Sequence, residues 1–357
     1  MDNSLKERIY KFDNIKLLAI MLVVVGHVID SFTSKSDMFR SLFIFIYAFH
    51  MPLFIFISGL FQQRFTDNNK LKINKVAYYI VLGFALKILN ALCKMLHGKK
   101  FRINFFGGGT IEWFLFVSVM FMVTAYLLRK VHPAITLSAS LILGCVCGYF
   151  DFIQDNFFIS RYLVFLPVYL LGYYMTPQLL IKIEKNYVVK IVSGLSMLLY
   201  FVLCFRSLSF VYQLRRLFTG RNPFSTLPFE NCGAQHRLLY YLISALLCMA
   251  VFCFIPNIRI PILSNMGKNT LSVYFWHRPL LYIISSTAFY PTVLSLGDPL
   301  YKIIILTFAV LLTLILSLDV FMMPLNALQK LINKLSKHWC YILIATPFVI
   351  GLILKFI

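Results

Sequence analysis

The stretch IKLLAIMLVVVGHVIDSF, residues 15–32, decides the fold class of this chain. It is long and apolar enough to cross a lipid bilayer as one helix, since a span needs about 20 mostly apolar residues. Its ionisable side chains are Lys16, His27 and Asp30. Because titratable groups are costly inside a membrane, each of the three is a candidate for function.

Similar apolar segments recur along the whole chain. Of its 357 residues, 60% are hydrophobic and 13% are charged, and the mean hydropathy is +0.80. Soluble domains are about one quarter charged. We therefore expect an all-α integral membrane protein, a polytopic bundle of about 10–11 transmembrane helices that forms a single domain over residues 1–357. The eleven candidate spans are residues 15–32, 39–61, 76–96, 111–128, 134–150, 161–175, 188–205, 238–255, 270–288, 302–322 and 339–357.

The charges are unbalanced, with 34 Lys and Arg against 13 Asp and Glu and a formal net charge of +21. In a soluble protein this excess would suggest a nucleic-acid partner. Here the basic residues lie in short loops beside apolar segments, as the positive-inside rule describes, so we expect no nucleic-acid partner. The rule favours a cytoplasmic N-terminus in a multi-pass protein of the plasma or inner membrane. Two basic loops, 99–102 and 206–237, disagree with that orientation.

The eight cysteines predict neither a disulfide framework nor a metal site. The chain contains no CxxC pair, and all the cysteines except Cys232 lie in or beside apolar segments. Such cysteines are typical of small apolar packing residues. We therefore expect no metal cofactor.

The spacing of the polar residues in the first span is the strongest local signal. Lys16 and His27 are eleven helical steps apart, which puts them within about 20° of the same face and about 16 Å apart along the axis. Asp30 follows His27 by three residues, where its carboxylate could accept a hydrogen bond from the imidazole. Alternatively, Lys16 only anchors at the interface and His27 bonds a neighbouring helix. Spacing alone does not decide between these interpretations.

The second candidate span contains His50-Met51-Pro52 and then Ser58-Gly59. A proline removes a backbone donor and frees a carbonyl, so we expect a kink beside His50. Ser58-Gly59 permits close approach of another helix. His50 is either part of a functional site at the kink or a hydrogen-bonded histidine in a packing interface.

Two later segments also carry polar groups into apolar surroundings. Glu112 follows three glycines at the start of the fourth span, where a carboxylate either belongs to a site or only complements the helix dipole. The glycines do not form a phosphate loop, because no Gly-Lys-Ser/Thr follows them. In the ninth span, His277-Arg278-Pro279 either binds an anion or orients a sugar, or it is an interfacial His-Arg pair.

Taken in order, these segments resemble the acyltransferase 3 family of membrane acyltransferases, in particular its stand-alone members related to fucose 4-O-acetylase. The most characteristic feature of the family is a Lys or Arg, ten residues and a His, which Lys16 and His27 match. The matching segments are FDNIK at 12–16 leading to Gly26-His27, HMPLF at 50–54 with Ser58-Gly59, WFL at 113–115, and GKNTL at 267–271 followed by Tyr274 and His277.

The resemblance implies an all-helical membrane enzyme of about ten spans. Such an enzyme uses acyl-CoA, usually acetyl-CoA, from the cytoplasm to acylate a hydroxyl of a cell-surface or lipid-linked glycan. The expected partners are therefore acyl-CoA, a carbohydrate acceptor and the lipid bilayer. The acceptor sugar, the acyl chain and the oligomeric state are not specified by the sequence.

Transfer to a hydroxyl needs a base that takes its proton during attack on the thioester. His27 is the first candidate for this base, with Asp30 as its orienter. His50, Glu112 and His277 are the other candidate catalytic residues. A covalent acyl-histidine on His27 and direct transfer are both compatible with the sequence.

Basic residues near the cytoplasmic side are the candidate binding residues for acetyl-CoA. Lys16 is expected to hold a CoA phosphate there, or else to polarise the thioester carbonyl. Arg64, Lys72 and Lys75, in the loop with Lys70, would attract the anionic donor further.

Three other functions compete with glycan acylation. A polysaccharide or lipid-linked sugar transporter, or an export subunit, would also have many spans, a kinked helix and a few buried polar groups. A non-catalytic assembly subunit of a surface-polymer complex would tolerate replacement of every histidine. Membrane acyltransferases that modify proteins or lipids with one buried histidine are ranked low, because of the Lys16–His27 spacing.

Overall fold

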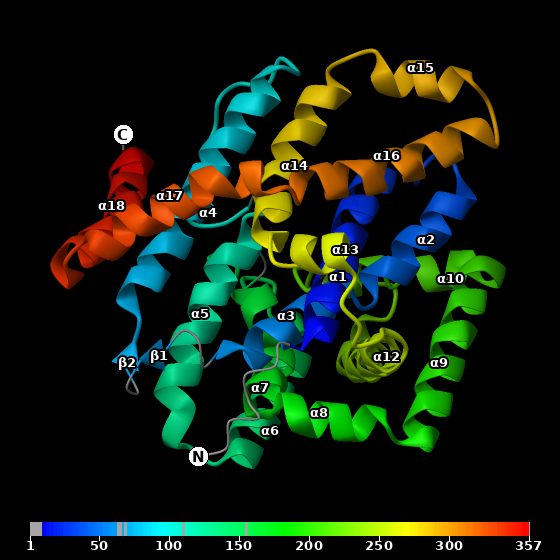
Figure 1. The fold of residues 1–357 in the computed structure, drawn as a ribbon, viewed down its shortest axis with the longest axis horizontal. Coiled ribbons are helices and arrows are strands. Elements are labelled where there is room, and N and C mark those ends of the chain that lie inside the picture. Colours follow the sequence, from blue (N-terminus) through cyan, green and yellow to red (C-terminus); the bar gives the residue numbers. More distant parts are fainter. Residues whose placement is uncertain (1–8, 63–65, 68–69, 109–110, 154–155, 357) are drawn as a thin grey trace.

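The structure is a computed structural model that describes residues 9–62, 66–67, 70–108, 111–153 and 156–356 (Figure 1). In these residues most of the chain is helical, and turns and loops connect the helices. The β-structure of the described residues consists of the two-residue strands β1 (Thr66–Asp67) and β2 (Lys70–Leu71), which pair antiparallel, and an isolated bridge between Gly107 and Asn156. The predicted all-α polytopic membrane protein is confirmed.

Six helical segments of the described chain are long and apolar enough to cross a membrane, and eight if each of two bent helix pairs is one span. The bent pairs are α7 (Ile159–Tyr174) with α8 (Pro177–Glu184), at 94°, and α16 (Leu300–Leu316) with α17 (Asp319–Lys334), at 48°. The six are α1 (Tyr10–Asp30), α2 with α3 (Asp37–Tyr47 and His50–Leu60), α4 (Ile73–Met95), α5 with η3 (Trp113–Leu127 and Leu128–Lys130), α9 (Tyr187–Arg206), and η6 with α12 (Glu230–Cys232 and Gly233–Phe254).

Two further candidate spans form shorter helices, with 14 residues in α6 (Pro133–Val146) and 16 in α14 (Thr270–Ser285), whereas α18 (Lys337–Phe356) has 20 residues. Polar residues limit the apolar run of α14, which contains His277 and Arg278. The other elements are α6 (Pro133–Val146), η4 (Cys147–Tyr149), α10 (Leu208–Tyr212), α11 (Arg215–Phe218), η5 (Phe224–Thr226), α13 (Pro261–Met266), α14 (Thr270–Ser285), α15 (Phe289–Ser295) and α18 (Lys337–Phe356).

The first helix, α1, lies at the centre of the bundle. It packs against α2, α3, α13, α14 and α16. Figure 1 shows α1 and α3 in the middle of the molecule, with α9 along one edge and α18 at the opposite edge. Functional side chains on α1 therefore face other helices on several sides.

The break between α2 and α3 matches the kink that the sequence predicts beside His50. Pro52 cannot donate to the carbonyl of Ala48, four residues earlier, as a helix would require. That carbonyl instead accepts a hydrogen bond from Ser244 Oγ on α12, at 2.5 Å. The His50 imidazole caps the preceding turn, because its Nδ1 lies 2.8 Å from the Ile46 carbonyl.

Helices α3 and α7 cross in close contact at two glycines. A Cβ at Gly59 would lie 2.1 Å from the carbonyl oxygen of Tyr169, and a Cβ at Gly172 would lie 2.1 Å from that of Phe56. Each glycine therefore makes room for the backbone of the other helix. The close approach predicted from Ser58-Gly59 is confirmed, and it fixes α3, which carries His50, against α7.

Candidate active site

A cavity of about 260 Å³ gathers several of the predicted catalytic residues. His27 and Asp30 line it from α1, His50 lines it from α3, and Arg278 lines it from α14. We call it the histidine cavity. Its other lining residues are Tyr47, Met51, Trp113, Arg161, Phe165, Phe218, Thr219 and Arg221.

The hydrogen bond of His50 defines which of its nitrogens can act as a base. A carbonyl oxygen only accepts, so the contact of Nδ1 with the Ile46 carbonyl puts the proton of the neutral ring on Nδ1. Nε2 then keeps its lone pair. His50 is only 4% exposed and lines the cavity, so this lone pair is held in a largely dry site.

His277 lies behind His27 and is absent from the cavity lining. The two imidazoles are stacked, with ring centroids 5.4 Å apart and planes inclined by 27°. Nδ1 of His277 donates to the Val273 carbonyl at 2.9 Å, and its fully buried Nε2 has no hydrogen-bond partner in the described part of the chain. His277 therefore packs against the ring of His27 without itself lining the cavity.

The two predicted catalytic carboxylates lie in different environments. Asp30 lines the cavity beside His27, but the described residues show no hydrogen bond between these two side chains. Glu112 is 2% exposed and its Oε1 accepts a hydrogen bond from Asn90 Nδ2, at 2.6 Å. It lies one residue before Trp113, which lines the cavity, so Glu112 is placed to fix the start of α5.

A second cavity, of about 340 Å³, lies at the other end of the same helices. Lys16 from α1, Lys75 from α4 and Lys268 before α14 line it, and we call it the lysine cavity. Lys72 lies three residues before Lys75 and outside this lining, and Arg64 lies outside the described residues. The other lining residues are Phe54, Ile57, Ser58, Phe61, Gln62, Tyr79, Phe114, Ser118, Met122, Tyr169, Thr270, Leu271 and Tyr274.

Three aromatic side chains, Phe54, Phe114 and Tyr274, close the lysine cavity on the side of the histidine cavity. The ring centroids of Phe54 and Phe114 are 6.2 Å apart, and those of Phe114 and Tyr274 are 5.4 Å apart. Each lies within one helical turn of a residue that lines the histidine cavity. We call these three residues the aromatic partition, because they divide two cavities that are aligned along α1.

The chain matches a known protein family over most of its length. The sequence model of the acyltransferase 3 family, described as an acyltransferase domain, matches residues 9–322. The chain belongs to the acyltransferase 3 family. The matched segment runs from α1 into α17 and so includes both cavities. Comparison with curated proteins and with solved structures gives no match.

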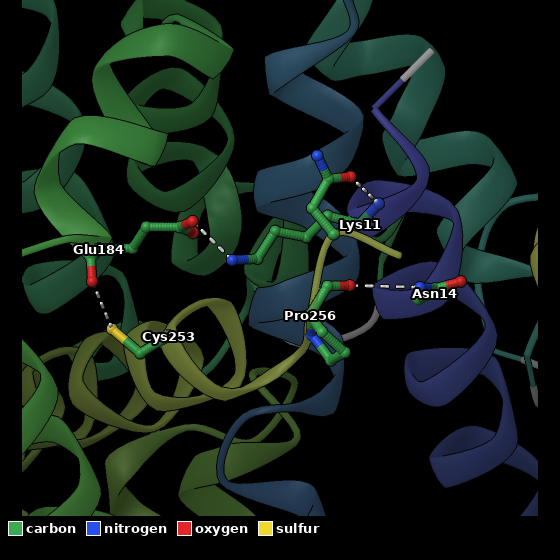
Figure 2. A network of polar contacts seen from close by, with 6 residues as sticks. Lys11, Asn14, Glu184, Cys253 and Pro256 are labelled. Carbon is green, nitrogen blue, oxygen red and sulfur yellow. Dashed lines mark hydrogen bonds and ion pairs between the residues drawn. The ribbon is translucent and has the colours of Figure 1, made fainter. Parts of the chain in front are cut away.

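In this membrane acyltransferase, the start of α1 is fixed by polar contacts with distant parts of the chain (Figure 2). Lys11 forms an ion pair with Glu184 of α8, at 2.6 Å, and both side chains are nearly buried. Asn14 Nδ2 donates to the carbonyl of Pro256, just after α12, at 3.3 Å. Lys16 is oriented by an ion pair with Asp13, at 2.7 Å. These contacts position Lys16 at the lysine cavity.

Sequence reasoning missed three charged residues of the two cavities. Lys268 belongs to the recognised segment 267–271 but was given no binding role. Arg161 begins a weak candidate span, and Arg221 lies in the basic loop that disagreed with the positive-inside rule. The disagreement with the positive-inside rule could have indicated Arg221, because a loop whose arginines face a cavity need not follow that rule.

Proposed function

We propose that this membrane acyltransferase moves an acetyl group from acetyl-CoA to a hydroxyl of a cell-surface or lipid-linked glycan. Acetyl-CoA would bind at the lysine cavity, and the glycan hydroxyl would enter the histidine cavity. The observation that carries the proposal is the alignment of the two cavities along α1, with Lys16 lining one and His27 lining the other.

The lysine cavity suits an anionic donor. CoA carries several phosphate groups, and lysine ammonium groups bind phosphate as point charges. Lys16, Lys75 and Lys268 supply three such groups from different elements. The Ser58 and Ser118 side chains and the aromatic partition would surround the less polar arm that carries the thioester. We further propose that this cavity and the N-terminus face the cytoplasm.

The histidine cavity suits activation of a hydroxyl. A neutral imidazole nitrogen would take the proton of the hydroxyl while its oxygen attacks the thioester carbonyl. The carbon–sulfur bond then breaks, the acetyl group stays on the sugar oxygen, and CoA leaves as a thiolate that takes up a proton. His27 is our first candidate for the base because it shares α1 with Lys16. His50 is the second, because its Nε2 keeps a lone pair.

The test compares acetylation by His27→Ala, His50→Ala and a matched control, His338→Ala. His338 is exposed on α18, away from both cavities. Proton NMR of surface polysaccharide from cells that contain each variant, with membrane abundance measured in parallel, reports O-acetyl groups. Removal of a general base lowers the rate by about 10²–10⁴-fold. Loss of the O-acetyl signal for either cavity variant or for both, with the signal kept in His338→Ala, supports the proposal.

Two outcomes count against this function. Wild-type O-acetylation in both cavity variants would exclude the histidine cavity from the chemistry. A polysaccharide without O-acetyl groups in the wild type, combined with no turnover of acetyl-CoA by the purified protein, would refute acetyl transfer to this class of acceptor.

A further inference from the structure

The lining of the histidine cavity is rich in arginine. Arg221 and Arg278 line it together with Arg161, and Asp30 is the one carboxylate in the lining. Met51, Trp113, Phe165 and Phe218 also line the cavity, and positive charge beside such apolar groups is energetically costly unless an anion accompanies it.

The positive charge continues into a neighbouring open cavity of about 460 Å³. Lys35, Arg40 and Arg215 line this second space, and Asp37 is its carboxylate. One short segment borders both spaces: Tyr212 and Arg215 line the open cavity, and Phe218, Thr219 and Arg221 line the histidine cavity. Residues 33–37, which follow Asp30, also line the open cavity.

These guanidinium groups are held by rings and hydroxyls more than by carboxylates. Arg40 and Arg215 lie over the ring of Tyr212, at 4.6 and 5.1 Å from its centroid, and Arg215 Nη1 donates to the Tyr212 hydroxyl at 2.9 Å. Among the described residues, Arg40 pairs with the exposed Asp37, at 3.2 Å, whereas no ion pair joins Arg215, Arg221 or Arg278 to a carboxylate.

Arg278 has an additional feature that points to a missing ligand. Its Nε is buried and has no hydrogen-bond partner in the described part of the chain, and its guanidinium lies 4.9 Å from the ring centroid of Tyr282. Arg278 directly follows His277, whose ring stacks on that of His27. An anion bound by Arg278 would therefore lie close to the candidate base.

We propose that the acceptor of this enzyme is an acidic glycan, whose carboxylate or phosphate group is bound by Arg278, Arg221 and Arg215. This inference rests on the proposed function and specifies its substrate class. The planar guanidinium fork matches both kinds of anion by paired hydrogen bonds. The lysine cavity provides separate cations for acetyl-CoA, so the arginines are available for the acceptor.

The arrangement also explains the unusual basic loop. Residues 206–237 contain several arginines on the side that the positive-inside rule assigns to the exterior. Arg215 and Arg221 line the two arginine-rich spaces, so their charges serve ligand binding and carry no information about orientation.

Binding, measured apart from turnover, tests the inference. Isothermal titration calorimetry of the full chain in lipid nanodiscs, without acetyl-CoA, compares three oligosaccharide series of matched length. One is a neutral glucan, one carries a carboxylate on each sugar, and one is linked by phosphodiesters. At least one acidic series should bind about tenfold or more tightly than the neutral series, and its affinity should fall as salt screens the exposed arginines.

Variants connect this binding to the arginines. Arg221→Gln and Arg278→Gln should each weaken binding of the preferred acidic series by about 10–100-fold, because each removes charge-assisted hydrogen bonds. Binding of acetyl-CoA should not change in either variant. Arg206→Gln is the matched control, since Arg206 is exposed at the end of α9 and lines neither space. Arg221 is also exposed, so its replacement should not affect folding.

Each outcome gives a decision. Preference for one acidic series identifies the carboxylate or the phosphodiester as the recognised group. Tight binding of both series shows that either anion is enough for recognition. Equal binding of the neutral series, no binding of either acidic series, or weakened acetyl-CoA binding by Arg221→Gln would overturn the inference. Acidic binding without any acetyl transfer would instead refute the proposed function.

Discussion

Replacement of Gly172 by alanine tests whether the contact between α3 and α7 holds the site together. The added Cβ would lie 2.1 Å from the Phe56 carbonyl oxygen, whereas ordinary contacts of this kind begin near 3.4 Å. Because the obstructing atom belongs to the backbone of α3, no side-chain rotation relieves the overlap. The helices must separate by more than 1 Å, and overpacking of this kind costs about 1–3 kcal/mol.

The expected result for Gly172→Ala is a lower unfolding temperature in detergent and weaker acetyl transfer, since α3 carries His50 and α7 carries Phe165 of the cavity wall. Size-exclusion chromatography after heating gives the first quantity, and release of free CoA gives the second. The matched control is Gly194→Ala on α9, whose Cβ would meet only the ring of Phe254, at 3.0 Å, which can rotate. If Gly172→Ala resembled this control in both assays, the reasoning would be refuted.

Three further predictions follow from individual contacts. His50→Asn keeps a donor for the Ile46 carbonyl but removes Nε2, so the variant should fold normally. If His50 is the base, kcat for acetyl transfer should fall by about 10²-fold or more. Normal turnover would exclude His50 as the base. Lys16→Ala should raise the KM for acetyl-CoA about tenfold, with a smaller change in kcat, because it removes one phosphate-binding charge. Steady-state kinetics measures both constants. An unchanged KM would contradict a role of Lys16 in binding acetyl-CoA. Glu184→Gln should lower the free energy of unfolding by about 3–5 kcal/mol in a denaturant titration, because it leaves the nearly buried Lys11 without its carboxylate. The double variant Glu184→Gln with Lys11→Met should recover much of this loss. A double variant as unstable as Glu184→Gln would argue against the ion pair as the cause.

The sequence predicted best what depends on a single helix. Lys16 and His27 share one face of α1 because eleven steps of a regular helix bring them together, and each lines one of the two aligned cavities. The break before Pro52 likewise follows from local chemistry, since proline has no backbone donor. Both features require no knowledge of how helices pack.

Contacts between distant helices could not be predicted in the same way. His50 and His277 were recognised separately, but their convergence on His27 depends on the packing of α1, α3 and α14, which no periodicity encodes. The expected hydrogen bond between Asp30 and His27 illustrates the same limit. Their spacing allows it, yet Asp30 lines the cavity with Arg278 and no such bond forms in the described structure. Two of the candidate spans, 134–150 and 270–288, form helices of 14 and 16 residues, because apolar composition alone does not show where a helix begins and ends.

The aromatic partition has an electrical consequence. In an intact bilayer, the membrane voltage is spread over a hydrocarbon core about 30 Å thick. Where polar cavities enter from both ends of α1, most of that voltage falls across the layer of Phe54, Phe114 and Tyr274. A neutral acetyl group crosses such a layer without electrical work, whereas each unit of charge that crosses the full potential involves about 2.3 kcal/mol per 100 mV. In the proposed reaction, the partition would therefore separate the acetyl group from its carrier by charge as well as by size, and it would retain the anionic CoA on the side from which it came.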